Sequence, residues 1–87
     1  MKVIEKKTWP ELFEKVKNHQ KNFDVRLADF KCQPGDVLVL KEWDPKVESY
    51  TGRVIKRKVK FVINTKELEK FWKKSEIKKN GFQVMGF

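Results

Sequence analysis

The sequence predicts an α+β fold in which about five or six short strands form a mixed, barrel-like sheet and two helices lie at its seams. Three observations favour this fold. Apolar and polar residues alternate along several segments, as in strands with one buried face. Two capping patterns mark helices near residues 10–19 and 65–75. A chain of 87 residues has room for one modest core, so we expect a single domain over residues 1–87.

The first two elements are expected to be a strand and a helix. Residues 2–7 form a short candidate strand. Thr8 and Glu11 have the spacing of a capping box, and Pro10 fits the first turn of a helix. We expect this helix to reach about His19. Its apolar side chains fall on one face, namely Leu12, Phe13 and Val16.

Three strands are predicted in the middle of the chain. Residues 22–27 alternate apolar and charged side chains, which indicates a half-buried strand. Residues 28–36 form a loop that ends in the turn sequence Pro-Gly-Asp. Residues 37–43 form a strongly apolar strand, and a hairpin connection then leads into a long strand over residues 53–63.

A helix and a closing strand are predicted for the last third of the chain. Asn64 or Thr65 can cap the helix, and Glu67 stands three residues after Asn64. The helix carries an apolar stripe at helical spacing, formed by Leu68, Phe71 and Trp72. Gly81 begins a closing strand over residues 82–87.

Charge indicates the class of partner. The chain has 21 Lys and Arg against 12 Asp and Glu, so its formal net charge is +9. A positive field of this size favours nucleic acid or another anionic partner, and we expect an RNA or nucleotide ligand. The alternative is that the lysines keep a small protein in solution. The high content of Lys and Glu is also typical of proteins from hot environments.

Several functional classes are disfavoured by the composition. Cys32 is the only cysteine, so neither an internal disulfide nor a cysteine-based zinc site is expected. We predict no metal and no cofactor. No run of about eighteen apolar residues is present, so we expect no membrane span. The single cysteine suits a reducing cytosol, so we expect a cytoplasmic protein, and we expect it to be a monomer.

A basic row is the first candidate site. Lys56, Lys58 and Lys60 alternate along one predicted strand, so their side chains share a face. Phosphates bind ammonium and guanidinium groups, and unpaired bases stack on aromatic rings. The chain supplies further groups of both kinds near this row, namely Lys31, Lys41, Arg53, Trp43 and Tyr50. The alternatives are a solvated strand face for the lysines and core or rim packing for Trp43 and Tyr50.

A charged triplet is the second candidate site. On a strand, Asp24 and Arg26 face the same side, and Lys21 stands just before that strand. The three side chains could line a cleft in which Arg26 binds a phosphate or base edge and Asp24 accepts from a base amine. The alternative is a structural ion pair of Asp24 with Lys21 or Arg26.

The same segments resemble a known family. Residues 21–26, Lys-Asn-Phe-Asp-Val-Arg, are similar to the Lys-x-x-Glu-x-Arg strand of ASCH domains, which belong to the PUA-like superfamily. Residues 33–38 resemble the Gly-Asp turn that follows it, and residues 40–43, 50–53 and 81–87 are similar to a small prokaryotic ASCH-like group of uncharacterised domains. The resemblance implies a PUA-like pseudo-barrel that binds RNA. It also implies that Lys21, Asp24 and Arg26 line a cleft.

The resemblance raises an enzymatic alternative as well. Some ASCH-like proteins remove the acetyl group of N4-acetylcytidine with a Lys, a Thr and a Glu. Lys21 matches the Lys, whereas Asp24 falls where the Thr would be and the Glu position offers Lys56 or Lys58. An enzyme acting on modified nucleosides, or a ribonuclease, would use Lys21 and Asp24. Because two of the three positions do not match, we favour a binding module.

Overall fold

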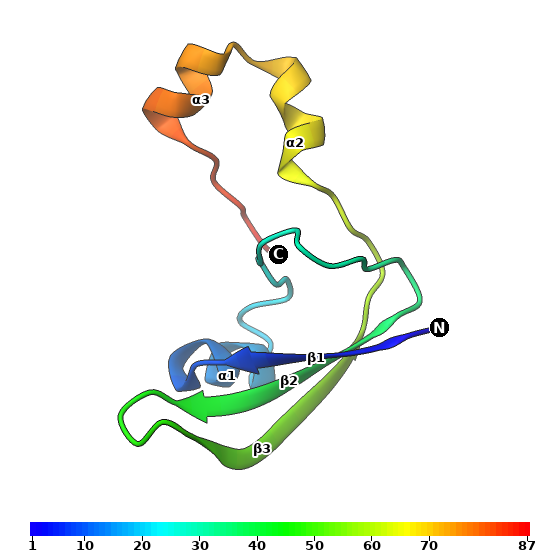
Figure 1. Cartoon of the computed structure of the whole chain (residues 1–87), viewed down its shortest axis with the longest axis vertical. Coiled ribbons are helices and arrows are strands. Elements are labelled where there is room, and N and C mark those ends of the chain that lie inside the picture. Colours follow the sequence, from blue (N-terminus) through cyan, green and yellow to red (C-terminus); the bar gives the residue numbers. More distant parts are fainter.

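The computed structural model describes residues 1–87 and contains one three-stranded mixed sheet (Figure 1). β1 (Val3–Thr8) lies parallel to β2 (Val37–Asp44), and β2 lies antiparallel to β3 (Ser49–Lys58). The spatial order is β1-β2-β3, so the most apolar strand is in the middle. Because parallel strands need a crossover, the chain passes through α1 (Pro10–Lys17) and a long loop before it enters β2.

The core lies between α1 and one face of the sheet. Phe13 and Val16 on α1 pack with Leu40 on β2 and Ile55 on β3. Leu40 and Ile55 are register partners, so their side chains lie side by side on the same face. Phe13, which is 1% exposed, and Leu40 are the largest fully buried side chains. The core therefore joins residues of the predicted helix 10–19 and of the predicted strands 37–43 and 53–63.

The boundaries of α1 differ slightly from those predicted. Trp9 occupies the N-cap position and makes no side-chain capping bond, while Pro10 begins the helix. Thr8 is buried at the end of β1 instead of capping the helix. The helix ends at Lys17, because His19 adopts the left-handed conformation with φ of 63°.

The prediction of a pseudo-barrel of five or six strands was wrong, because the sheet has three strands and stays open. Residues 22–27 and 82–87 form no strand, and β3 ends at Lys58. Alternation shows only which side chains can share a face, whereas a strand also needs a neighbour for its backbone groups. In the first segment, Asp24 and Arg26 bond to each other, and Arg26 also bonds to the end of β1. Near the C-terminus, Gly86 lies so close to the Phe23 ring that a Cβ at this position would collide with it.

The helix predicted over residues 65–75 is divided into three short pieces. These are α2 (Thr65–Leu68), the 3-10 turn η1 (Glu69–Phe71) and α3 (Lys74–Asn80). Trp72 separates the last two, because its backbone is extended with φ of −137° and ψ of 158°. The capping role of Asn64 is confirmed, since its side chain accepts a 2.9 Å hydrogen bond from the Lys66 N–H. None of the short helices could span a membrane.

Residues 59–87, which we call the C-terminal arm, project from the sheet (Figure 1). The arm runs out to α2 and α3 and then returns, so that the C-terminus lies near the loop that precedes β2. No residue of its helices is buried. The Cα radius of gyration is 14.8 Å, whereas a compact domain of this length has about 12 Å. The structure is therefore a small sheet domain with an extended arm.

Candidate nucleic-acid interface

The sheet face opposite α1, which we call the open face, has no helix packed on it (Figure 1). Register partners share a face, so the pairs Lys7 with Lys41 and Val39 with Lys56 identify the side chains that line it. The open face therefore carries basic residues from all three strands and one acidic residue. The charged residues are Lys7, Lys41, Lys56, Lys58 and Glu5.

Two aromatic rings lie at the hairpin end of the open face. Trp43 and Tyr50 pair across β2 and β3, and their ring centroids are 5.0 Å apart at an interplanar angle of 79°. The Lys7 Nζ lies 3.7 Å from the Trp43 ring centroid, and the Lys41 Nζ lies 4.6 Å from that of Tyr50. We call these four residues the aromatic corner. It brings two ammonium groups and two rings together at one exposed end of the sheet.

The predicted basic row is partly on this face. Lys56 and Lys58 are exposed register partners of Val39 and Val37, so they lie on the open face. Lys60 comes after the end of β3. Lys31 lies in the loop before β2, where its carbonyl accepts a 2.6 Å hydrogen bond from the Lys2 side chain. The structure therefore joins Lys41, Trp43, Lys56 and Lys58 on the open face and leaves Lys31 and Lys60 outside the sheet.

Arg53 lies on the opposite face of the sheet, beside α1. Its guanidinium donates to both carboxylate oxygens of Glu42, at 2.9 Å each, and to Glu14 of α1 at 2.8 Å. The Thr51 hydroxyl donates to the same Glu42 carboxylate at 2.6 Å. Hydrogen bonds from Arg53 and then from Thr51 lower the pKa of Glu42 from 4.5 to about 2. The same contacts raise the pKa of Arg53, so this residue links the sheet to the helix as an ion pair.

The charged triplet does converge, although it lies on a loop and not on a strand. The Lys21 Nζ donates to the Phe23 carbonyl at 2.6 Å and lies 3.6 Å from Asp24. Arg26 donates from Nε to Asp24 at 2.6 Å. Its other donors bond to the Lys7 carbonyl at 2.8 Å and to the Thr8 hydroxyl at 2.9 Å. The guanidinium of Arg26 is thus engaged within the fold and ties the loop to the end of β1.

Asp36 holds the loop that leads into β2. Its carboxylate accepts from the backbone N–H groups of Lys2 at 3.0 Å and Gln33 at 2.9 Å. The hydrogen bond from Gln33 is the main cause that keeps the pKa of Asp36 below its ordinary value. The turn is completed by Gly35, whose φ of 98° favours glycine. The Gly-Asp motif therefore orients β2 beside β1 and contributes no group to the open face.

Sequence reasoning missed the contribution of Lys7. Its position within the predicted strand 2–7 was visible, but the partner strand and the register were not. Once β1 pairs in parallel with β2, Lys7 aligns with Lys41 and reaches Trp43. The period-two pattern alone could have placed Lys7 with Glu5 on one face, but not beside the aromatic pair.

Residues 3–87 match the model of one protein family, which is described as a domain of unknown function (DUF3850). No curated protein and no solved structure matches the chain. The description of the matched family names no activity, ligand or partner.

Proposed function

The chain belongs to the DUF3850 family, and we propose that it binds single-stranded RNA on the open face of its sheet. The observation that carries this proposal is the aromatic corner, in which Lys7 and Lys41 lie over Trp43 and Tyr50. Single-stranded RNA presents phosphates and unpaired bases together, and this end of the sheet offers a partner for each.

The charge of the open face supports a phosphate backbone as ligand. Four lysines and one glutamate line it, and Glu5 lies 3.8 Å from Lys41. Lys56 and Lys58 make no ion pair within the chain, so their ammonium groups are free to contact phosphates. From Tyr50 to Lys58 the strand spans about 26 Å, enough for several nucleotides in a row.

The aromatic corner favours unpaired bases over a duplex. Tyr50 is exposed and Trp43 is half-buried, so an unstacked base can reach the Tyr50 ring. Bases within a duplex have both faces covered by their neighbours and cannot stack on a side chain. The resemblance of residues 21–26 and 33–38 to ASCH domains adds support for RNA as the nucleic acid.

Binding is a better proposal than catalysis because the residues of the enzymatic alternative are engaged within the loop. The Lys21 ammonium bonds to a backbone carbonyl and lies near Asp24, and Asp24 bonds to Arg26. These contacts hold the loop in place and add no support for an activated amine.

The decisive experiment is a salt titration with a labelled, unstructured RNA of about ten nucleotides, a length within the range one small binding domain covers. Changing both Lys56 and Lys58 to Ala should reduce the slope of log K against log salt by about 1.4, since each lost contact to a single strand removes about 0.7. The matched control changes Lys15 and Lys17, two exposed lysines on α1 at the same spacing, to Ala.

Both double variants have the same net charge, so only the position of the lysines differs between them. We expect the control to keep the wild-type slope. Equal losses in the two variants would show attraction by net charge alone and would overturn the assignment to the open face. Absence of binding by the wild-type protein at low salt would overturn the function itself.

A further inference from the structure

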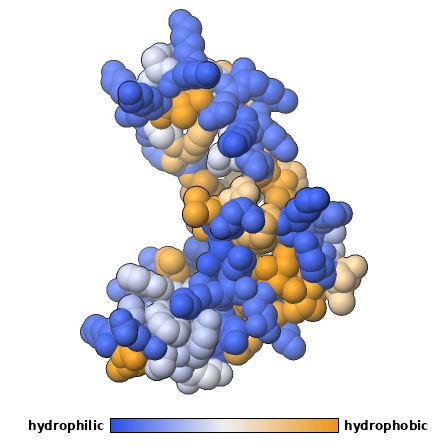
Figure 2. Space-filling model, in the orientation of Figure 1, coloured by the Kyte–Doolittle hydropathy of each residue, from blue (hydrophilic) through white to orange (hydrophobic).

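The C-terminal arm exposes many large apolar side chains. Phe61 is 75% exposed and Phe71 is 64% exposed. Phe71, Trp72 and Phe82 form a chain of edge-to-face contacts, with ring centroids 5.9 Å apart in each step. In the space-filling view, apolar side chains lie open around the narrow waist between the sheet and the arm (Figure 2). Exposed apolar surface of this kind marks an interaction site.

The amount of exposed surface fits a protein interface. The chain exposes 7486 Å², whereas a compact monomer of 10.5 kDa exposes about 5,400 Å². The excess is about 2,000 Å² per chain, and two chains that covered it would bury about 4,000 Å² in total. Obligate homodimers bury about 2,000–5,000 Å². The surface excess of the whole chain is therefore of the size that a homodimer buries.

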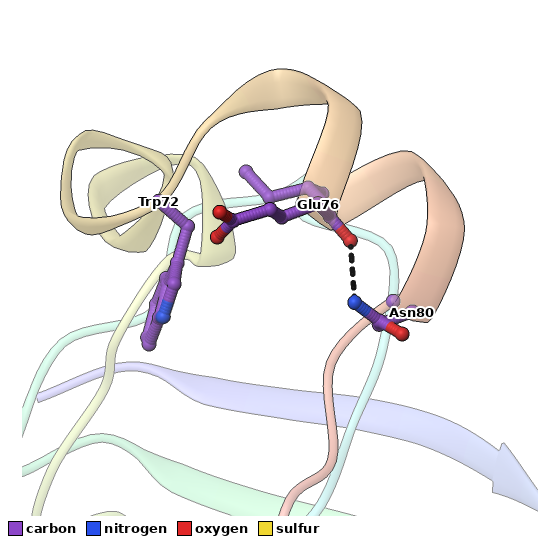
Figure 3. Close-up of a pocket in the computed structure, with 5 residues that line it drawn as sticks. Trp72, Glu76 and Asn80 are labelled. Carbon is purple, nitrogen blue, oxygen red and sulfur yellow. Dashed lines mark hydrogen bonds between the residues drawn. The ribbon is translucent and has the colours of Figure 1, made fainter.

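The arm also contains a pocket suited to a side chain of the same protein. Trp72, Glu76, Ile77, Asn80 and Gly81 line a hollow of about 250 Å³ that is open to solvent on one side. For comparison, an apolar cavity of roughly 150 Å³ holds a benzene molecule. Figure 3 shows the Glu76 carboxylate turned toward Trp72, with the Asn80 side chain donating to the Glu76 carbonyl at 3.2 Å. A ring beside a carboxylate suits the stem and ammonium group of a lysine.

The arm has seven lysines and three glutamates, so its net charge is +4 and only some of its lysines can pair with the glutamates of a second arm. The glutamates are Glu67, Glu69 and Glu76, and none of them makes an ion pair within the chain. Lysines lie between and around these glutamates, as Lys66, Lys70, Lys73, Lys74, Lys78 and Lys79. A two-fold contact places each surface against its own copy, so the lysines of one arm can meet the glutamates of the other.

We infer that two copies of this chain associate through their C-terminal arms to form a symmetric homodimer. The aromatic residues Phe71, Trp72 and Phe82 lie at the centre of the interface, and a lysine of each arm enters the pocket between Trp72 and Glu76 of the other. The sequence alone led us to expect a monomer. The inference does not depend on the proposed RNA binding, because the arm and the open face share no residue.

Sedimentation equilibrium of the full chain over a wide concentration range tests this inference. The wild-type protein should sediment as a dimer. Trp72→Ala should raise the dimer dissociation constant by at least about tenfold, because a central tryptophan carries a large share of interface energy. The matched control is Trp9→Ala: Trp9 is 59% exposed and Trp72 49%, but Trp9 lies next to α1. It should associate like the wild type.

A second variant guards against an effect on folding. Glu76→Gln is isosteric and on an exposed helix surface, and it should also weaken the dimer. A monomeric wild-type protein at high concentration would overturn the inference, as would dimerisation that neither Trp72→Ala nor Glu76→Gln weakens. RNA binding by the monomeric Trp72→Ala variant separates the two proposals. Its RNA affinity per chain should match that of the wild type, because dimerisation does not involve the open face.

Discussion

Arg53 donates two hydrogen bonds, from Nε and Nη2, to the two carboxylate oxygens of Glu42, and each bond is 2.9 Å long. The paired, two-pronged geometry is among the strongest that side chains form. Glu42 is 4% exposed, so its charge depends on this partner. The pair sits where β2, β3 and α1 meet, since Arg53 also contacts Glu14 of α1. Arg53, which the sequence analysis proposed as a phosphate ligand, therefore has a structural role.

Acid should remove the stabilisation that Glu42 provides. Its pKa falls from 4.5 in the unfolded chain to about 2 in the folded protein, so the folded state favours the charged form. The contribution is complete above pH 4.5 and is lost as the pH falls toward 2. Urea unfolding between pH 2 and 7 measures this effect. At pH 7 the free energy of unfolding of Glu42→Gln should be about 1–3 kcal/mol lower than that of the wild type. It should also vary less with pH.

The control for this experiment is Glu11→Gln, which removes an exposed carboxylate from the first turn of α1. It should retain the wild-type pH dependence. If Glu42→Gln and the wild type lost stability in parallel from pH 4.5 to 2, the Glu42–Arg53 pair would not be the cause of acid sensitivity.

Tyr50 should contribute to RNA affinity by stacking and not by charge. Tyr50→Ala should weaken single-stranded RNA binding by about 1–3 kcal/mol if one base stacks on the ring. Tyr50→Phe preserves the ring and should bind like the wild type. The slope of log K against log salt should stay the same in both variants, because no cation is removed. Fluorescence anisotropy with labelled RNA measures both the affinity and its salt dependence. Equal RNA affinity of the Ala and Phe variants would exclude stacking at this position.

The charged triplet should prove structural. Arg26 uses Nε, Nη1 and Nη2 in three different contacts, and a lysine cannot reproduce this fork. Arg26→Lys should therefore lower the melting temperature, while RNA affinity of the folded variant stays within about twofold of the wild type, a difference well below one lost contact. Arg57→Lys is the control: this exposed arginine of β3 has only one contact outside its own strand, a 3.4 Å hydrogen bond to the Val16 carbonyl, so the variant should melt close to the wild type. A stable Arg26→Lys protein with weakened RNA binding would instead establish a ligand-binding cleft.

Phe13 is a core position at which truncation should be costly. Phe13→Ala should cost about 3–5 kcal/mol, because it leaves a cavity against Leu40 and Ile55. A domain of this length has only about 4–13 kcal/mol of stability, so the variant should be close to unfolding. Leu12→Ala removes an exposed neighbour on the same helix and should change stability by less than about 1 kcal/mol. Urea unfolding, monitored by circular dichroism, measures the stability of both variants. Equal stability of Phe13→Ala and Leu12→Ala would contradict this account.

Local pattern was sufficient for the elements whose partners are near in sequence or strongly apolar. Pro10 and the apolar spacing placed α1, and Asn64 placed the start of α2. The run over residues 37–43 corresponds to β2, and the alternation around Ile55 correctly separated the buried face of β3 from its lysines. These signals are read from spacing alone, because helices and half-buried strands repeat at fixed periods.

The pairing of distant segments was decided only by tertiary structure. Whether residues 22–27 became a strand depended on a neighbour, and the bonds of Arg26 to Asp24 and to the end of β1 hold them as a loop instead. The parallel register of β1 and β2 placed Lys7 over Trp43, and the hairpin register placed Arg53 against Glu42. From the sequence alone, Arg53 could contact either a ligand or a buried carboxylate. Only the pairing of distant segments decides that it contacts Glu42. The sequence by itself determined which side chains could share a face, and the fold determined what each face meets.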